Sequence, residues 1–356
     1  MNIIKKTSFL VALAATALSF AAAPAFSRAT APSELSPAAI QGAIDAAYAK
    51  FKDLNEGANA DYIPALAKVD SKIFGIAVVT ADGRVYTKGD ITSEVSIQSI
   101  SKVFTMAKVM QEQGPEAIVK TIGVDATGLR FNSIIAVEIA QKALGGPEIN
   151  PLVNPGAITA TSMVKGNSRA EVWNSILNFH SDFAGRPLKV NEEVFKSEAD
   201  TNQRNQAIGA LMYAYDFIKS DWKQAVDVYT EQCAISVNAK DLAVMAGTLA
   251  NGGKNPVTGK QVLAVGNVPY VLAVMSTAGL YDDSGKWLYR TGLPAKSGVG
   301  GGIIAVSPGN FGIAVISPPL DKAGNSVKAQ KAIEAISNAL GGNPYAVTPV
   351  AAMTKK

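Results

Sequence analysis

The spacing of apolar positions along the first third of the chain predicts a helix, a hairpin and a second helix. Residues 36–53 carry apolar side chains three or four positions apart, which is typical of an amphipathic helix. Residues 74–89 alternate apolar and polar positions around a turn at 81–83, which indicates a hairpin. From Ser99 the period becomes helical again, until a Gly-Pro pair at Gly114 ends it.

The rest of the chain shows a helical block, then strands, then a closing helix. Helical patterns lie at 133–144, 169–180, 203–219 and 240–250, strand patterns at 302–307 and 311–317, and the closing helix at 329–340. A sheet needs helices to cover its apolar face, so we expect an α/β protein of the α+β type, with one sheet built from both chain ends. The predicted domains are a sheet domain over 28–115 and 251–345, a helical domain over 116–250 and a tail over 346–356.

The first 27 residues have the features of a secretory signal peptide. Lys5 and Lys6 precede an apolar run over 9–23, and small residues follow it at 25–27. The alternative is an uncleaved membrane anchor, but a spanning helix needs about 20 apolar residues and this run is shorter. We therefore expect a signal peptide over 1–27, export to the periplasm or the medium, and no stable membrane anchor after cleavage.

Composition narrows the possible chemistry. The 356 residues include one Cys and one His, so an internal disulfide, a CxxC pair and a Cys-based zinc site are excluded. Nothing around His180 resembles a catalytic triad, and Cys233 lies in an apolar helical stretch. The proton-transfer group of an enzyme would then be Lys, Tyr or a carboxylate, and we expect no metal and no cofactor. With 33 basic against 29 acidic residues and no long basic block, we also expect no nucleic-acid partner.

An S-x-x-K sequence joins Ser99 to Lys102 at the start of the second predicted helix. This spacing puts a hydroxyl and an amine on one helix face, where a neutral amine could take the hydroxyl proton. The same spacing recurs at Ser162 and Ser220, but only Ser99 follows a hairpin and begins an apolar helix. A K-S-G sequence begins at Lys296, and the two motifs together are used by penicillin-recognising acyl-transfer enzymes. Lysine has a pKa of about 10.4 in water, and we hypothesise that the like charge of Lys296 lowers it in Lys102.

Residues 60–326 resemble the serine-dependent glutaminases along their whole length. The matching segments lie at 60–64, 97–104, 131–133, 150–158, 197–198, 204–205, 229–233, 249–253, 279–282, 292–303, 317–321 and 324–326. The resemblance implies a β-lactamase/DD-peptidase-like fold, with a mainly antiparallel sheet, flanking helices and an inserted helical domain. It also implies hydrolysis of L-glutamine to L-glutamate and ammonia, and assembly as a homo-oligomer, a dimer or a tetramer.

The resemblance also implies a set of functional positions. These are Tyr62, Ser99, Lys102, Asn154, Glu198, Asn205, Tyr229, Tyr281 and Val299. We expect Ser99 to attack the side-chain amide carbon while Lys102 accepts its proton, assisted by Tyr62 or Tyr281. The oxyanion would rest on the backbone N–H groups of Ser99 and Val299.

The remaining positions suit the two charged groups of the amino acid. Glu198 is an acceptor for the α-ammonium, and Asn154, Asn205 and Tyr229 supply donors for the α-carboxylate. Pro155 departs from the alanine usual in the family, and a change in substrate affinity near Asn154 would follow from its fixed φ and missing N–H.

Two other functions fit parts of the sequence. An exported β-lactamase or penicillin-binding-type enzyme would use the same pair of motifs, but no S-D-N element accompanies them. An exported amino-acid-binding protein without catalysis would leave Ser99 and Lys102 idle.

Overall fold

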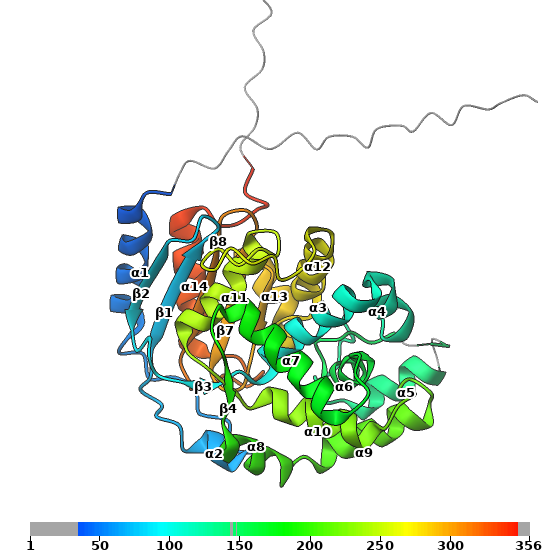
Figure 1. The fold of residues 1–356 in the computed structure, drawn as a ribbon. Coiled ribbons are helices and arrows are strands. Elements are labelled where there is room, and N and C mark those ends of the chain that lie inside the picture. The colour runs from blue at the N-terminus through cyan, green and yellow to red at the C-terminus, as the bar shows by residue number, and fades with distance from the viewer. Residues whose placement is uncertain (1–34, 143–144, 147, 348–356) are drawn as a thin grey trace, which may run out of the picture. The chain divides into compact units, whose positions relative to one another are not determined.

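The computed structural model describes residues 35–142, 145–146 and 148–347 (Figure 1). The predicted signal peptide over 1–27 lies outside the described residues, and so does most of the predicted tail over 346–356. No helix in the described ranges is both long and apolar enough to cross a membrane.

Helices and short strands follow one another along the chain. The first elements are α1 (Pro37–Phe51), α2 (Pro64–Ala67), β1 (Gly75–Thr80), β2 (Val85–Gly89), β3 (Val95–Ser96), η1 (Gln98–Ile100), α3 (Ser101–Gln113), α4 (Pro115–Thr121), α5 (Ile134–Lys142), α6 (Asn154–Met163) and α7 (Arg169–Ala184). They are followed by β4 (Lys189–Val190), α8 (Glu192–Ala199), α9 (Gln203–Ala214), α10 (Trp222–Cys233), β5 (Ile235–Val237) and α11 (Ala239–Ala250). The last are η2 (Val265–Asn267), α12 (Val268–Ala278), η3 (Tyr281–Asp283), α13 (Ser284–Thr291), β6 (Ala295–Ser297), β7 (Gly302–Ser307), β8 (Phe311–Ile316) and α14 (Val327–Leu340).

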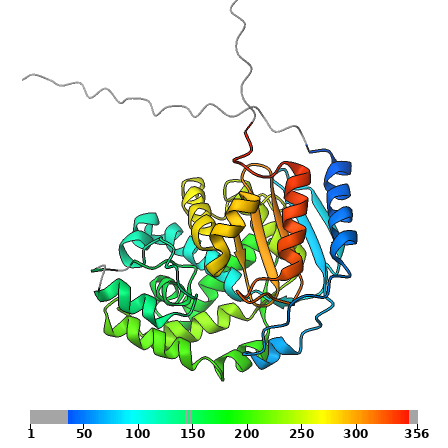
Figure 2. The same ribbon diagram turned by 180° about the vertical axis from the view of Figure 1, so that it is seen from behind.

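One antiparallel sheet is built from both halves of the chain, in the order β2-β1-β8-β7-β6. Because successive side chains of a strand point to opposite faces, β1 contributes to two cores. Ala77 and Val79 pack in the core that contains α11, whereas Ile76 and Val78 pack with α1 and α14 (Figure 2). The predicted fold class, an antiparallel sheet flanked by helices, is confirmed.

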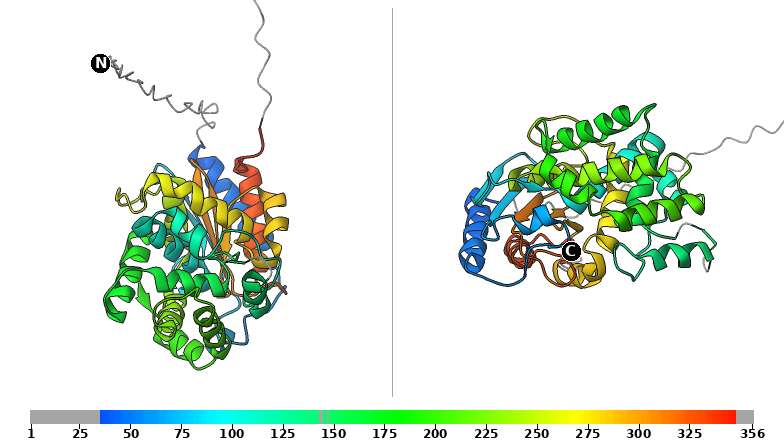
Figure 3. Two further views of the ribbon diagram at one scale, coloured as in Figure 1. Left: turned by 90° about the vertical axis from the view of Figure 1, so that its right-hand side faces the viewer. Right: turned by 90° about the horizontal axis from the view of Figure 1, so that it is seen from below.

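A second group of helices lies to one side of the sheet (Figures 1 and 3). Helices α5, α6, α9 and α10 bury a separate apolar cluster among themselves. The last helix within the predicted helical domain over 116–250 is α11. It does not join this cluster, because it packs directly on β1, β7 and β8 of the sheet. A small three-stranded sheet, in the order β3-β5-β4, joins the segment before η1 to the segment after α10.

Side-chain caps and turn residues set helix ends that periodicity alone misplaces. The closing helix, predicted from residue 329, begins at Val327 because the Ser326 hydroxyl accepts a hydrogen bond from the backbone of Ala329. The helix predicted over 203–219 ends at Ala214, since Asp216 has a φ of +63° and leaves the helical region.

Candidate active site

Ser99 and Lys102 lie side by side where η1 runs into α3. Ser99 belongs to the tight turn of η1, and Lys102 to the first turn of α3. The Lys102 Nζ is 2.6 Å from the Ser99 Oγ, and both residues are buried. The S-x-x-K spacing therefore brings hydroxyl and amine into direct contact, as expected from the sequence.

The Lys102 amine is poised to lose its proton near neutral pH. Burial lowers its pKa to about 8, and the negative charge of Glu198 opposes this shift. The hypothesis that Lys296 lowers this pKa is therefore replaced by desolvation as the cause. Burial, followed by the charge of Lys102, lowers the pKa of Lys296 well below its usual value.

Asn154 connects the lysine to the helical group. Its Oδ1 lies 2.8 Å from the Lys102 Nζ and accepts a hydrogen bond of 3.1 Å from the Tyr229 hydroxyl. Its Nδ2 donates to the Asn205 Oδ1 at 2.9 Å. Its backbone N–H donates to the carbonyl oxygen of Phe131 at 2.7 Å. Both ends of the Asn154 amide are thus fixed, and three of the predicted positions meet around it.

Pro155 is compatible with this arrangement. It lies in the first turn of α6, where a backbone N–H has no partner within the helix. The missing N–H therefore removes no helical hydrogen bond, and the side chain of Asn154 keeps all its contacts.

Glu198 is a buried carboxylate held by the residue before the nucleophile. The Gln98 Nε2 donates to the Glu198 Oε2 at 3.1 Å. Gln98 has a φ of +49°, an uncommon conformation for a residue with a side chain. Burial raises the pKa of Glu198 to about 7, while the Gln98 hydrogen bond and the Lys102 charge oppose the shift. The prediction of functional positions omitted Gln98, although its place directly before Ser99 was a usable signal.

Replacing Glu198 by glutamine is expected to stabilise the unliganded protein at pH 8. The pKa of this carboxyl is about 7 when folded, against an ordinary value of 4.5 for glutamate, so ionisation of the folded form costs free energy as pH rises through this window. We expect the variant to gain about 2–3 kcal/mol in unfolding free energy at pH 8 and less than about 1 kcal/mol at pH 5. Urea unfolding at both pH values measures the difference.

Glu193→Gln is the matched control, because Glu193 is an exposed carboxylate on the same helix, α8. Its unfolding free energy should change by less than about 0.5 kcal/mol at either pH. A Glu198→Gln variant that is less stable than wild type at pH 8 would contradict the predicted cost of the buried charge.

Tyr281 lies beside Ser99. Its hydroxyl donates to the carbonyl oxygen of Ser297 at 3.3 Å, and its ring lies 4.9 Å from that of Phe131. Burial raises the pKa of Tyr281 to about 12, and side-chain hydrogen bonding to Ser99 acts against that rise. The phenol is therefore neutral at pH 7, with a proton that it can donate.

The loop that carries Val299 packs against the segment just before Ser99 because glycines flank Val299. A Cβ on Gly298 would lie 2.7 Å from the carbonyl oxygen of Ile97, and one on Gly300 would overlap the carbonyl oxygen of Ser96. Only glycine allows this loop to pack against the backbone just before Ser99. Within the described ranges, no oxygen accepts a hydrogen bond from the backbone N–H of Ser99 or of Val299. Both donors are available to an oxyanion.

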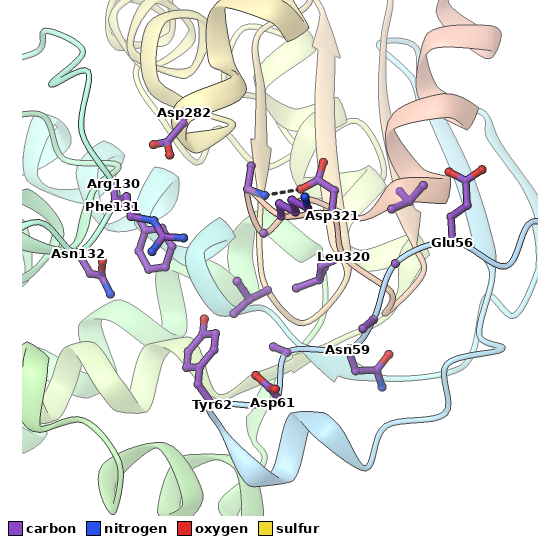
Figure 4. A pocket seen from close by; sticks show the side chains of 18 residues that line it. Glu56, Asn59, Asp61, Tyr62, Arg130, Phe131, Asn132, Asp282, Leu320 and Asp321 are labelled. Carbon is purple, nitrogen blue, oxygen red and sulfur yellow. Dashed lines mark hydrogen bonds between the residues drawn. The ribbon is translucent and has the colours of Figure 1, made fainter.

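A pocket of about 760 Å³ is lined by Val299 and Tyr62, but not by Ser99 or the other predicted site residues (Figure 4). Tyr62 is 54% exposed and lines the pocket on the same side as Phe131 (Figure 4). The segment that carries it packs on α8, since the backbone N–H of Ala65 donates to the Ser197 Oγ at 3.1 Å. In the described part of the chain Tyr62 makes no hydrogen bond to Ser99 or Lys102, whereas Tyr281 shares a side-chain hydrogen bond with Ser99.

The single His and the single Cys of the chain are both buried. The ring nitrogens of His180 face the carbonyl oxygens of Ile176 and Ser101, and burial lowers its pKa to about 4. Cys233 is buried and free. Among the described residues, no group of three or more His, Cys, Asp or Glu side chains is arranged to hold a metal ion.

Comparison with known proteins points to one family. The glutaminase family model matches residues 57–345. A glutaminase of Colwellia psychrerythraea is 54% identical over 306 residues, which cover 86% of this chain and 97% of that protein. A glutaminase of Brucella canis is 50% identical over 307 residues, covering 86% of this chain and 96% of that protein.

Solved structures agree with the sequence relatives. The structure named as the probable glutaminase YbaS has a TM-score of 0.85 and 47% identity, covering 88% of this chain and 100% of that one. A structure named as a probable glutaminase from Bacillus subtilis, in complex with 6-diazo-5-oxo-L-norleucine, has a TM-score of 0.73 and 29% identity, covering 84% of this chain and 93% of that one.

Proposed function

Because the chain belongs to the glutaminase family and hydrolyses L-glutamine to L-glutamate and ammonia, we propose that Ser99 is its nucleophile and Lys102 its general base. The observation that carries this assignment is the 2.6 Å contact between a hydroxyl and a buried amine whose pKa is about 8. A neutral Lys102 takes the proton of Ser99 as the Oγ attacks the side-chain amide carbon. Substitution of each residue, with ammonia release as the readout, tests the assignment.

The tetrahedral intermediate forms between Ser99 and the two free backbone donors. Its oxyanion accepts hydrogen bonds from the backbone N–H groups of Ser99 and Val299. Such hydrogen bonds stabilise a negative charge most strongly where water is excluded. Tyr281, a neutral phenol at working pH, passes a proton to the departing nitrogen. Ammonia leaves with that proton, a glutamyl ester remains on Ser99, and the proton held by Lys102 passes back to the Tyr281 phenolate. The neutral Lys102 then accepts a proton from the water that attacks the ester, and returns it to the Ser99 Oγ as glutamate leaves.

The charged groups of the amino acid bind on the side of α8 and α9. Glu198 accepts from the α-ammonium, and binding strengthens as its carboxyl ionises above a pKa of about 7. Asn205 offers its amide N–H groups to the α-carboxylate, because only its Oδ1 is used by Asn154. Tyr229 adds a hydroxyl at the same place. The Asn154 amide orients Lys102 and Asn205 together.

The place of action and the assembly are further parts of the proposal. The basic and apolar pattern of residues 1–27 supports export through a cleaved signal peptide to the periplasm or the medium. The family resemblance supports a homo-oligomer, a dimer or a tetramer. We expect the exported chain to begin at Arg28, as read by amino-terminal sequencing of the periplasmic fraction. An intact leader on protein held in the membrane fraction would contradict this expectation, and light scattering of the purified protein measures the assembly.

A further inference from the structure

A second buried lysine lies close to the catalytic residues without touching Ser99. Lys296, on β6, is fully buried. Its Nζ donates to the carbonyl oxygen of Gly279 at 2.9 Å and to that of Ser297 at 2.8 Å. Burying a lysine costs free energy, so we expect this side chain to have a structural or a functional role.

The same amine lies against the face of Tyr281. The Lys296 Nζ is 4.1 Å from the centroid of the Tyr281 ring, within the range of a cation–π or N–H to ring contact. The carbonyl oxygen of Ser297 accepts from both side chains, from the Lys296 Nζ and from the Tyr281 hydroxyl. The ring plane and the hydroxyl of Tyr281 are therefore both fixed by groups that Lys296 holds.

The backbone at Tyr281 needs such support. Tyr281 has a φ of +53°, a conformation that a residue with a side chain adopts at a cost. Two residues earlier, Gly279 packs so closely on β6 that a Cβ would overlap the carbonyl oxygen of Ala295. Lys296 joins the two segments here, because its amine holds the Gly279 carbonyl of one and the Ser297 carbonyl of the other.

We propose that Lys296 is a positioning residue for Tyr281, whose phenol it holds against Ser99 by supporting the ring face and the turn from Gly279 to Tyr281. The inference rests on the proposed role of Tyr281 as proton donor. Lys296 acts here through another side chain and contacts neither substrate nor reacting atoms. Both protonation states of the amine carry N–H groups for the two carbonyl oxygens, so the support does not require a permanent charge.

A double-mutant cycle tests this inference. Lys296→Met is expected to lower kcat by about 10–100-fold with KM changed less than about threefold, because a displaced phenol impairs proton transfer rather than binding. Tyr281→Phe should lower kcat by a similar factor. In the Tyr281→Phe protein, adding Lys296→Met should cost less than about threefold more, since the hydroxyl that it positions is gone.

Lys328→Met is the matched control. Lys328 is also buried, its Nζ donates to the carbonyl oxygen of Lys52, and it lies 5.4 Å from the Phe74 ring, away from the site. Its loss should lower stability without lowering kcat by more than about twofold. If Lys296→Met fails to fold, the same cycle is run with Lys296→Gln, which keeps N–H donors for folding but removes the amine from the face of the Tyr281 ring, so a loss of kcat with the same coupling to Tyr281→Phe is expected.

The possible outcomes distinguish the positioning role of Lys296 from the proposed role of Tyr281 as proton donor. Equal losses of kcat on removing Lys296, with and without the Tyr281 hydroxyl, would overturn the positioning role. A Tyr281→Phe enzyme with unchanged kcat would instead contradict the proposed role of Tyr281 in catalysis. Strong coupling between the two substitutions supports both.

Discussion

Replacing Ser99 by alanine is expected to lower kcat for ammonia release from L-glutamine by at least about 10⁴-fold. The alanine variant has no oxygen to form the glutamyl ester, and the oxyanion donors of the backbone alone stabilise only direct attack by water. Glutamine should still bind with a Kd within about tenfold of wild type, because Glu198 and Asn205 remain. A coupled assay for ammonia and calorimetric titration with glutamine measure the two quantities.

Ser220→Ala provides the control for Ser99→Ala. Ser220 begins another S-x-x-K sequence of the chain, but it is exposed and precedes α10 in a loop. Its variant should retain wild-type kcat and KM. Equal rates of ammonia release in wild type and Ser99→Ala would refute Ser99 as the nucleophile.

Replacing Lys102 by methionine is expected to lower kcat by about 10³-fold and to remove the rise of activity near pH 8. A base works in its neutral form, so wild-type kcat should increase as pH rises through the Lys102 pKa of about 8 and level off above it. Ionisation of Glu198, with a pKa of about 7 before substrate binds, adds to the rise of kcat/KM but not to that of kcat at saturation. Steady-state kinetics from pH 6 to pH 10 separate the two groups.

Lys102→Arg is the stringent companion variant, because it keeps a positive charge but cannot lose it in this pH range. Its kcat should be as low as that of Lys102→Met. A variant with arginine that keeps a substantial rate, or a methionine variant that keeps the rise near pH 8, would exclude Lys102 as the general base.

Local patterns predicted the parts of the site whose residues are neighbours in sequence. Ser99 and Lys102 are three residues apart, so helical geometry alone brings their side chains together. The hairpin over 74–89 and the closing helix follow in the same way from periodicity. The resemblance to glutaminases supplied Glu198 and the other distant positions, and it supplied them as a set without geometry.

Contacts between side chains from distant segments could not be predicted from the sequence. The hydrogen bond from Gln98 to Glu198 joins residues 100 positions apart, and no local sequence pattern predicts this pairing. The contact of Lys296 with Tyr281 depends on how closely Gly279 approaches β6. The predicted cause of the low pKa of Lys102, the charge of Lys296, was wrong for the same reason. The cause is burial, and the burial of a side chain depends on how distant segments pack together.

The two alternative functions are now disfavoured by different observations. Curated glutaminases match the chain at 50% identity or more over at least 306 residues, which places it with them and not with β-lactamases. A binding protein without catalysis would have no need for a buried amine 2.6 Å from a serine hydroxyl, with its pKa lowered to about 8.

The glutamyl ester on Ser99 is tested most directly by partitioning with hydroxylamine. Hydroxylamine and water compete for the ester, giving γ-glutamyl hydroxamate and glutamate. If L-glutamine and the γ-methyl ester of glutamate both acylate Ser99, they pass through one intermediate, and the ratio of hydroxamate to glutamate must be the same for both at each hydroxylamine concentration. A ratio that depends on whether ammonia or methanol has left would contradict a common glutamyl-enzyme.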